Sequence, residues 1–129
     1  MNPKVLIGIP TCDWYGYCLL DFIASLRNQD YENFDVLFVD NSETEEYTEK
    51  IRSLGFNVKR VSHFERARER MVQSRNLMRK EALENNYDYL FLLDQDVIIP
   101  PNALSKLLSN NNQVTTGIYC SICDVDNKP

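Results

Sequence analysis

The sequence predicts an α/β protein with an open, mainly parallel sheet that is covered by helices on both faces. Short apolar runs at 5–9, 34–40 and 89–93 have the length of buried strands. Segments with apolar residues at helical spacing lie between these runs. Continuous apolar strands joined by helical crossovers are typical of parallel sheets that are buried on both faces. This pattern predicts a single domain over residues 1–129.

The first half of the chain predicts three strands and two helices. Residues 5–9 are apolar and β-branched, and Pro10 closes this first strand. Apolar residues recur at helical spacing from 18 to 26, and the apolar run 34–40 forms a second strand that ends on a carboxylate. The next helix ends at the glycine of position 55, before a short strand at 56–61. The apolar face of that second helix consists of Tyr47, Ile51 and Leu54.

The second half begins with the longest predicted helix, from Glu65 to about Glu84. Its apolar stripe consists of Ala67, Met71, Met78 and Ala82. Arg75 lies within this stripe, which predicts a guanidinium turned toward the protein that needs an anionic or hydrogen-bonding partner. A fourth strand at 89–93 follows, then a short helix opened by Pro100-Pro101-Asn102, and a fifth strand at 113–120.

Composition narrows the possible partners. The net charge of -5 argues against a general nucleic-acid binder, because phosphate contacts need a basic surface. Residues 65–80 nevertheless carry six bases and two acids, a local basic patch that suggests an anionic small molecule. No signal peptide pattern or run long enough to cross a bilayer is present, so we expect a cytoplasmic protein with reduced thiols at Cys12, Cys18, Cys120 and Cys123.

Polar residues follow three of the predicted strands. They are Pro10-Thr11-Cys12-Asp13, Asp40-Asn41-Ser42 and Asp94-Gln95-Asp96. In an open parallel sheet, ligands bind outside the carboxyl ends of the strands, near the point where the strand order reverses. We therefore expect these three strand ends to share one rim.

Asp94 and Asp96 are the strongest candidates for metal ligands. In extended backbone, residues at this spacing point to the same side, and two like charges so placed repel unless a cation lies between or beyond them. Carboxylate oxygens suit Mg²⁺ or Mn²⁺, which complete their coordination with water and phosphate oxygens. The alternative is that both acids only begin a solvated loop.

Other polar residues also have structural alternatives. Arg75 could form an internal salt bridge with a rim aspartate, and Asp40 could cap a helix. His63, a lone histidine beyond a short strand, is more typical of a structural role than of a general base. No hydroxyl residue has a His or Lys at a spacing that would indicate an activated nucleophile. No nucleophilic catalyst is therefore predicted, and the catalytic residues stay unassigned.

The order of these motifs resembles the nucleotide-binding half of GT-A glycosyltransferases, especially their family 2. The resemblance is carried by VLIGIPTCD, SLRNQDYENFDVLFVDNS, SRNLMRKEAL and YDYLFLLDQDVIIPPNAL, and it extends from Val5 to about Tyr119. Each motif alone is weak, whereas four in the same order and spacing are fairly specific. The resemblance implies a nucleotide-diphosphate-sugar donor and a Rossmann-like, GT-A fold.

The resemblance also implies roles for individual residues. Thr11 and Asp40 would contact the base or ribose, Arg75 the nucleotide or its diphosphate, and Asp94 the ribose or a metal-bound water. Asp96 would be the main ligand of a divalent cation, Mn²⁺ or Mg²⁺. The implied binding set is Pro10, Thr11, Asp13, Asp40, Arg75 and Asp94, with Asp94 and Asp96 for the metal.

The chain departs from the family in two respects. The turn after the first strand reads Cys12-Asp13, which leaves the role of Asp13 open. Only residues 97–129 follow Asp96, which is too short for the half that holds the acceptor, whether lipid-linked, protein or glycan. The chain is therefore a fragment, a minimal member that uses a partner's surface, or a binding module without transfer activity. Exposed sheet edges would also permit a homo-oligomer.

Two other functions compete with sugar transfer. A non-catalytic nucleotide-sugar-binding module is compatible with the same motifs, because fold alone does not establish turnover. LFLLDQDV also resembles the strand and Asp-x-Asp motif of haloacid dehalogenase-type phosphatases. In those enzymes the motif lies on the leading strand, whereas here three strand-helix units precede it.

Overall fold

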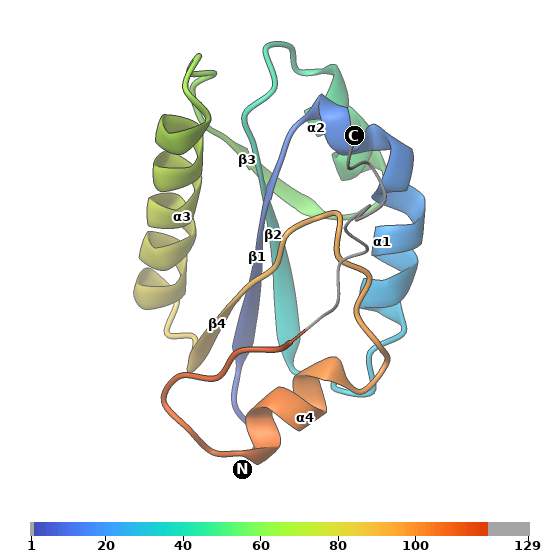
Figure 1. Ribbon diagram of the computed structural model, residues 1–129, viewed down its shortest axis with the longest axis vertical. Helices are drawn as coiled ribbons and strands as arrows, with labels where there is room; N and C mark the ends of the chain where they lie inside the picture. Colours follow the sequence, from blue (N-terminus) through green and yellow to red (C-terminus); the bar gives the residue numbers. More distant parts are fainter. Residues whose placement is uncertain (1, 119–129) are drawn as a thin grey trace, which may run out of the picture.

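The computed structural model describes residues 2–118, which form one parallel sheet with helices on both faces (Figure 1). The order of elements is β1 (Val5–Thr11), the 3-10 helix η1 (Asp13–Cys18), α1 (Leu19–Arg27), β2 (Phe34–Asp40), α2 (Glu46–Ser53), β3 (Asn57–Arg60), α3 (Ala67–Glu84), β4 (Tyr89–Leu92) and α4 (Ala103–Ser109). The strand order is β3-β2-β1-β4, and all three pairings are parallel. The predicted fold class is confirmed.

The two faces of the sheet have separate hydrophobic cores. Val5, Ile7 and Ile9 of β1 pack with residues of α1, α2 and α4 on one face. Leu6, between them in sequence, faces the other way and packs with Met78 of α3. Successive residues of a strand point to opposite faces, which is why a continuous apolar run is needed here. Figure 1 shows α3 alone on one side of the sheet and α1 with α2 on the other.

The strand order reverses between β1 and β4, and the two strands separate there. The chain places β2 and then β3 on one side of β1, and it then crosses over to place β4 on the other. The register of β1 with β4 ends at Gly8, whose carbonyl accepts from Leu93 N at 3.0 Å. Pro10 is the next residue of β1 on that side, and it has no N–H to offer a partner strand. A cleft therefore opens between the carboxyl ends of β1 and β4.

One predicted element is absent from the described residues. Residues 113–118 of the predicted fifth strand are not in a strand and are exposed, and 119–120 lie outside the described part of the chain. The apolar and β-branched residues of this segment predicted a strand, but in the structure its Val114 and Ile118 are 88% and 97% exposed. The sheet consequently ends at β4 within residues 2–118. No helix in that range is long and apolar enough to cross a membrane.

Candidate functional site

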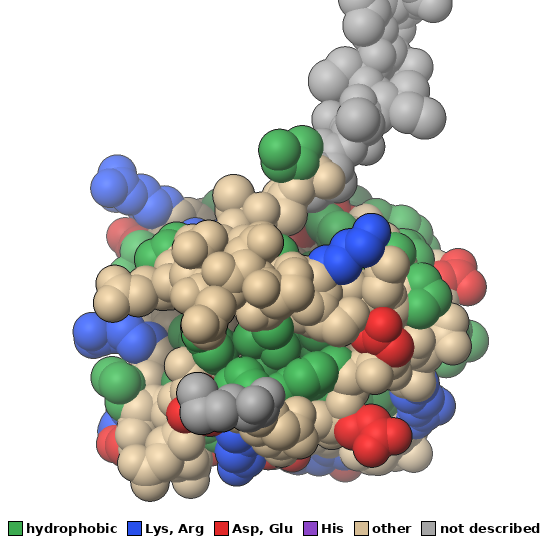
Figure 2. All heavy atoms as spheres, turned by 90° about the horizontal axis from the view of Figure 1, so that it is seen from below, with side chains coloured by type: hydrophobic (Ala, Val, Ile, Leu, Met, Phe, Trp, Pro, Cys, Tyr) green, Lys and Arg blue, Asp and Glu red, His purple; other side chains and the backbone are tan. Residues whose placement is uncertain are grey.

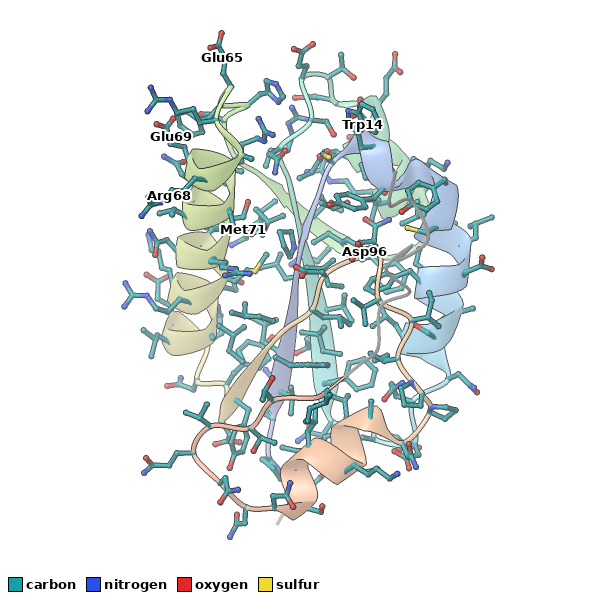
Figure 3. All side chains as sticks on the ribbon, in the orientation of Figure 1. Trp14, Glu65, Arg68, Glu69, Met71 and Asp96 are labelled. Atoms are coloured by element: carbon teal, nitrogen blue, oxygen red, sulfur yellow. The ribbon has the colours of Figure 1, made fainter. Side chains whose placement is uncertain are left out.

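A pocket of about 210 Å³ lies at the carboxyl ends of β1 and β4. Its walls are residues 10–12 at the end of β1, residues 94–96 after β4, and the first turns of α3, with Tyr15 and Asn41 completing the lining. Figure 3 shows Met71 directed from α3 toward the sheet, whereas Arg68 and Glu69 point away from it. The pocket occupies the point where ligands bind in open α/β sheets.

Asp94 and Asp96 stand on a β-turn. The amide of Val97 donates to the carbonyl of Asp94 at 3.1 Å, and both aspartates are exposed whereas Gln95 between them is 1% exposed. The prediction that they share extended backbone is therefore wrong, because β4 ends at Leu92. Both carboxylates still line the pocket, and neither has a hydrogen-bond partner among residues 2–118.

Gln95 ties this turn to the interior. Its Oε1 accepts a hydrogen bond from the hydroxyl of Thr11, and the Tyr47 hydroxyl lies 3.1 Å from Oε1 and 2.9 Å from Nε2. Its Nε2 donates to the carbonyl of Tyr15 at 2.8 Å. Sequence reasoning missed Gln95, because a polar residue between two acids carries no pattern that signals burial.

Asp40 is fully buried at the end of β2. Its Oδ1 accepts from Ser42 N at 2.9 Å and from Ser42 Oγ at 2.6 Å, and its Oδ2 accepts from the Thr48 hydroxyl and lies 3.6 Å from Arg60 Nη1. The predicted contact of Asp40 with a base or ribose would require this network to open. In the structure Asp40 joins β2, α2 and β3 below the rim, as an internal partner and not as a helix cap.

Arg70, and not Arg75, is the arginine that lines the pocket. Arg70 is half-buried, and its Nη1 donates to the carbonyls of Phe64 and Glu65, at 3.0 Å for the second. Arg75 is exposed, so the prediction of an inward-turned guanidinium is wrong. The helical stripe predicted it, but the core face of α3 runs through Ser74, Met78 and Ala82.

The first turns of α3 overhang the pocket instead of packing on the sheet. Ala67 and Met71 were predicted to belong to the core stripe, but both are exposed and line the pocket. Met71 is 37% exposed, whereas Met78 two turns later is fully buried. The apolar stripe of this helix therefore has two functions along its length: it packs the core at one end and forms a pocket wall at the other.

The remaining predicted residues surround the pocket. Pro10 and Thr11 line it, but Thr11 is 1% exposed and its hydroxyl is directed to Gln95. Asp13 is exposed and is not among the pocket-lining residues; its amide donates to Ser42 Oγ at 2.9 Å and so links the ends of β1 and β2. His63 contacts the carbonyl of Asn41 at 2.8 Å through Nδ1, outside the pocket lining.

The pocket has a negative field around Asp94 and Asp96. Burial, followed by the charges of Asp96 and Asp94 among its neighbours, raises the pKa of the Tyr15 phenol. Burial also raises the pKa of the Cys12 thiol, an effect opposed by a backbone hydrogen bond at Trp14 and, more weakly, by the charge of Arg70. Tyr15 and Cys12 therefore stay protonated near neutral pH. Asp94 and Asp96, whose carboxylates have no partner within residues 2–118 and lie beside a neutral phenol and a neutral thiol, form a site where a cation would be stabilised.

The donor set fits a Mg²⁺ or Mn²⁺ ion shared with a ligand. Within residues 2–118 no group of three or more His, Cys, Asp or Glu side chains could hold a metal ion. Among the described residues, the pocket lining offers two carboxylates, and these cations are commonly held by one or two carboxylates together with water and phosphate oxygens.

Comparisons with known proteins agree with this geometry. Residues 7–128 match the sequence model of a family described as glycosyl transferase family 2. A curated protein of Rickettsia bellii (strain RML369-C), named "Uncharacterized glycosyltransferase", is 30% identical over 114 residues, which are 86% of this chain and 16% of the relative. The chain thus spans about a sixth of that relative's length.

Two solved structures share the fold. The S. aureus TarS fragment 1–349 in complex with UDP superposes with a TM-score of 0.59 and 23% identity over 83% of this chain and 32% of the fragment. S. aureus TarS in a second structure gives a TM-score of 0.59 and 21% identity, over 83% of this chain and 20% of that chain. At this identity the likeness concerns the fold alone. The extent of the family match, taken with the parallel sheet and the pocket at its reversal point, shows that the chain belongs to glycosyl transferase family 2.

Proposed function

We propose that this chain is the donor-binding part of a glycosyltransferase, and that it binds a nucleotide-diphosphate sugar with Mn²⁺ or Mg²⁺ in the pocket between β1 and β4. The observation that carries the proposal is the pair Asp94 and Asp96, both exposed on one turn at the point where the strand order reverses. Their charges have no protein partner within residues 2–118, so they are available to a cation.

The walls of the pocket supply complementary groups. Asp96 is the proposed main metal ligand, and Asp94 faces the ribose or a water of the cation. Arg70 lies across the pocket on α3 and offers a fixed positive charge to a diphosphate. Arg75, one helical turn after Met71 on the same side of α3, is a second candidate for the diphosphate once a ligand is present. Pro10 and Thr11 form the wall where the base or ribose would lie, and Asp13 lies beside it.

A bound divalent cation would offset the charge of the diphosphate and stabilise the nucleoside diphosphate as it leaves. The residues of this chain hold the donor in place and keep the phenol of Tyr15 neutral beside it. The acceptor, whether lipid-linked, protein or glycan, is outside this proposal, as is the general base. A cytoplasmic location and a homo-oligomer stay predictions from the sequence.

A binding module without transfer activity is the second candidate. Asp94 and Asp96 are the only carboxylates that line the pocket within the described residues, and both are assigned to the cation. No further acid or histidine in that lining is placed to deprotonate an acceptor. This observation favours a module or a donor-binding part that acts together with a separate acceptor surface.

Titration of uridine diphosphate and of other nucleoside diphosphates, with and without Mn²⁺, tests binding by calorimetry. UDP is the first probe because it is bound in the similar TarS structure. Release of free nucleoside diphosphate from a sugar donor then separates the two candidates: release with a cation supports a transferase, and tight binding without release supports a module. Affinities that do not change with Mn²⁺ for any nucleotide would contradict the proposed cation site.

A further inference from the structure

We propose that Gln95 is the positioning residue of the cation site, a role that rests on the proposed function. Its buried amide holds the turn of residues 94–97 so that the carboxylates of Asp94 and Asp96 face the pocket. The side chains of the two aspartates have no hydrogen-bond partner within residues 2–118. Their direction therefore depends on the backbone of the turn, and the turn is anchored through the residue between them.

The anchor connects three parts of the fold. Thr11 belongs to the end of β1, Tyr47 to α2, and the carbonyl of Tyr15 to η1. The backbone carbonyl of Gln95 also accepts a weak hydrogen bond from Cys18 Sγ at 3.6 Å. Partners on three separate elements fix the Gln95 side chain in position and orientation, and this restricts the turn to one arrangement.

The chemistry of the anchor favours glutamine specifically. Oε1 accepts from the Thr11 hydroxyl and lies within reach of the Tyr47 hydroxyl, while Nε2 must donate to the Tyr15 carbonyl. A carboxylate has no proton for that carbonyl, and an apolar side chain satisfies none of the partners. A buried polar group left without a partner is strongly unfavourable, so the network is sensitive to substitution.

The test compares Gln95→Met with Gln29→Met. Gln29 is a matched control, because its amide also ties a loop to the body of the protein: Nε2 donates to the carbonyls of Ser25 and Pro100, at 3.1 and 2.9 Å. It lies outside the pocket lining. Both substitutions remove an anchoring amide at nearly constant volume, but only Gln95→Met touches the turn that carries the carboxylates.

Water-proton relaxation with Mn²⁺, at a fixed UDP concentration, measures protein-bound cation without any turnover. We expect Gln95→Met to weaken Mn²⁺ binding by about 10- to 100-fold, the usual effect of removing a group that orients metal ligands. Gln29→Met should leave the Mn²⁺ affinity within about twofold of the wild-type value, even if this substitution lowers the stability of the protein. In an Asp96→Ala background, Gln95→Met should have no further effect on Mn²⁺, because the two act on one site.

Unchanged Mn²⁺ binding in a folded Gln95→Met variant would overturn the role of Gln95 alone. If the wild-type protein binds no Mn²⁺ with UDP, both this role and the proposed function are wrong.

If Gln95→Met does not fold, Thr11→Val removes one hydrogen bond of the same amide, and hydrogen exchange of the Val97 amide reports the turn without metal. Faster exchange at Val97 with unchanged exchange in β1 supports the anchor, and equal exchange there contradicts it.

Discussion

Asp35 and Asp88, at the amino ends of the strands, differ from Asp94 and Asp96, at the carboxyl ends, in how their charges are used. At the amino ends, the Asp88 carboxylate accepts from the Lys4 amide at 2.7 Å, and Asp35 accepts from the Tyr87 hydroxyl at 2.7 Å. At the carboxyl ends, the carboxylates of Asp94 and Asp96 have no hydrogen-bond partner within residues 2–118. A carboxylate that is already bonded contributes to the fold, whereas an exposed and unpartnered one is available to a ligand.

A larger hollow lies at the amino ends of the strands. A hollow of about 1160 Å³ is bordered by Asp88, Tyr31 and the loop after α4, compared with about 210 Å³ for the pocket at the carboxyl ends. Figure 2, which looks onto the amino ends, shows hydrophobic side chains inside the hollow and charged ones separately at its margins. The proposed cation site is therefore distinguished by its two carboxylates and its place at the reversal point, and not by its volume.

Asp96→Ala gives the largest expected contrast between the ends. Removal of the main proposed metal ligand should reduce Mn²⁺-dependent binding of UDP by at least about 100-fold, because one exposed carboxylate holds Mn²⁺ or Mg²⁺ poorly. Asp88→Ala removes an aspartate at the amino end and should leave this affinity unchanged. Calorimetry with and without Mn²⁺ measures the UDP affinity of both variants. An equal loss of affinity in the two variants would contradict the assignment of the cation site to the carboxyl ends.

Asp40→Ala should have the largest effect on stability. It leaves Arg60 and Thr48 without their buried partner, and breaking such a pair lowers the free energy of unfolding by about 3–5 kcal/mol. Asp35→Ala at the amino end removes an exposed ion pair and the hydrogen bond from Tyr87, and should lower the free energy of unfolding less, by about 1–2 kcal/mol. Urea denaturation compares the two variants, and similar midpoints would show that the Asp40 network is not a stabilising centre.

Arg70→Gln and Arg75→Gln separate the two arginines of α3. Loss of a charge-assisted hydrogen bond to the diphosphate should weaken UDP binding by about 10-fold in Arg70→Gln, the arginine that lines the pocket. The effect of Arg75→Gln should be smaller, about twofold, because its guanidinium is exposed. A larger loss in Arg75→Gln would show that ligand binding draws Arg75 into the pocket in place of Arg70.

Tyr87 should produce a small alkaline effect that is confined to the amino end. Burial, and then the hydrogen bond to Asp35, raises the pKa of Tyr87 to about 12, above the ordinary value near 10. The stability that this neutral phenol contributes is fully present below about pH 10 and is lost as the pH rises through about 12. Tyr87→Phe should therefore show a flatter decline of the urea midpoint over this range. An identical decline in both proteins would contradict the contribution of Tyr87.

The sequence predicted the sheet because its strands are buried on both faces. The runs that form β1, β2 and β4 are apolar enough to be recognised without knowledge of their neighbours, and the rule for open sheets placed Pro10 and Asp94 at one rim correctly. The segment 113–118 has a similar composition but lies exposed in the structure. Local propensity cannot show whether a neighbouring strand is present to pair with such a segment.

The candidate site was less predictable because it depends on long-range hydrogen bonds. The Gln95 side chain accepts a hydrogen bond from Thr11, 84 residues earlier in the chain. No local sequence pattern predicts a contact over this separation. Which of Arg70 and Arg75 lines the pocket depends on where α3 loses contact with the sheet. The apolar stripe of a helix predicts which face is buried, but it does not predict how far along the helix the core extends. The binding roles of Thr11, Asp13 and Asp40, and the metal-ligand roles of Asp94 and Asp96, stay predictions.

Paramagnetic broadening of backbone amide signals tests the central claim most directly, because Mn²⁺ affects both ends of the sheet differently in one experiment. With UDP and substoichiometric Mn²⁺, the amides of Thr11, Gln95 and Val97 should broaden strongly, while those of Tyr31, Asp88 and Ser105 at the opposite end should stay sharp. Broadening centred on Asp88, or spread evenly over the protein, would contradict a cation site at the carboxyl ends of β1 and β4.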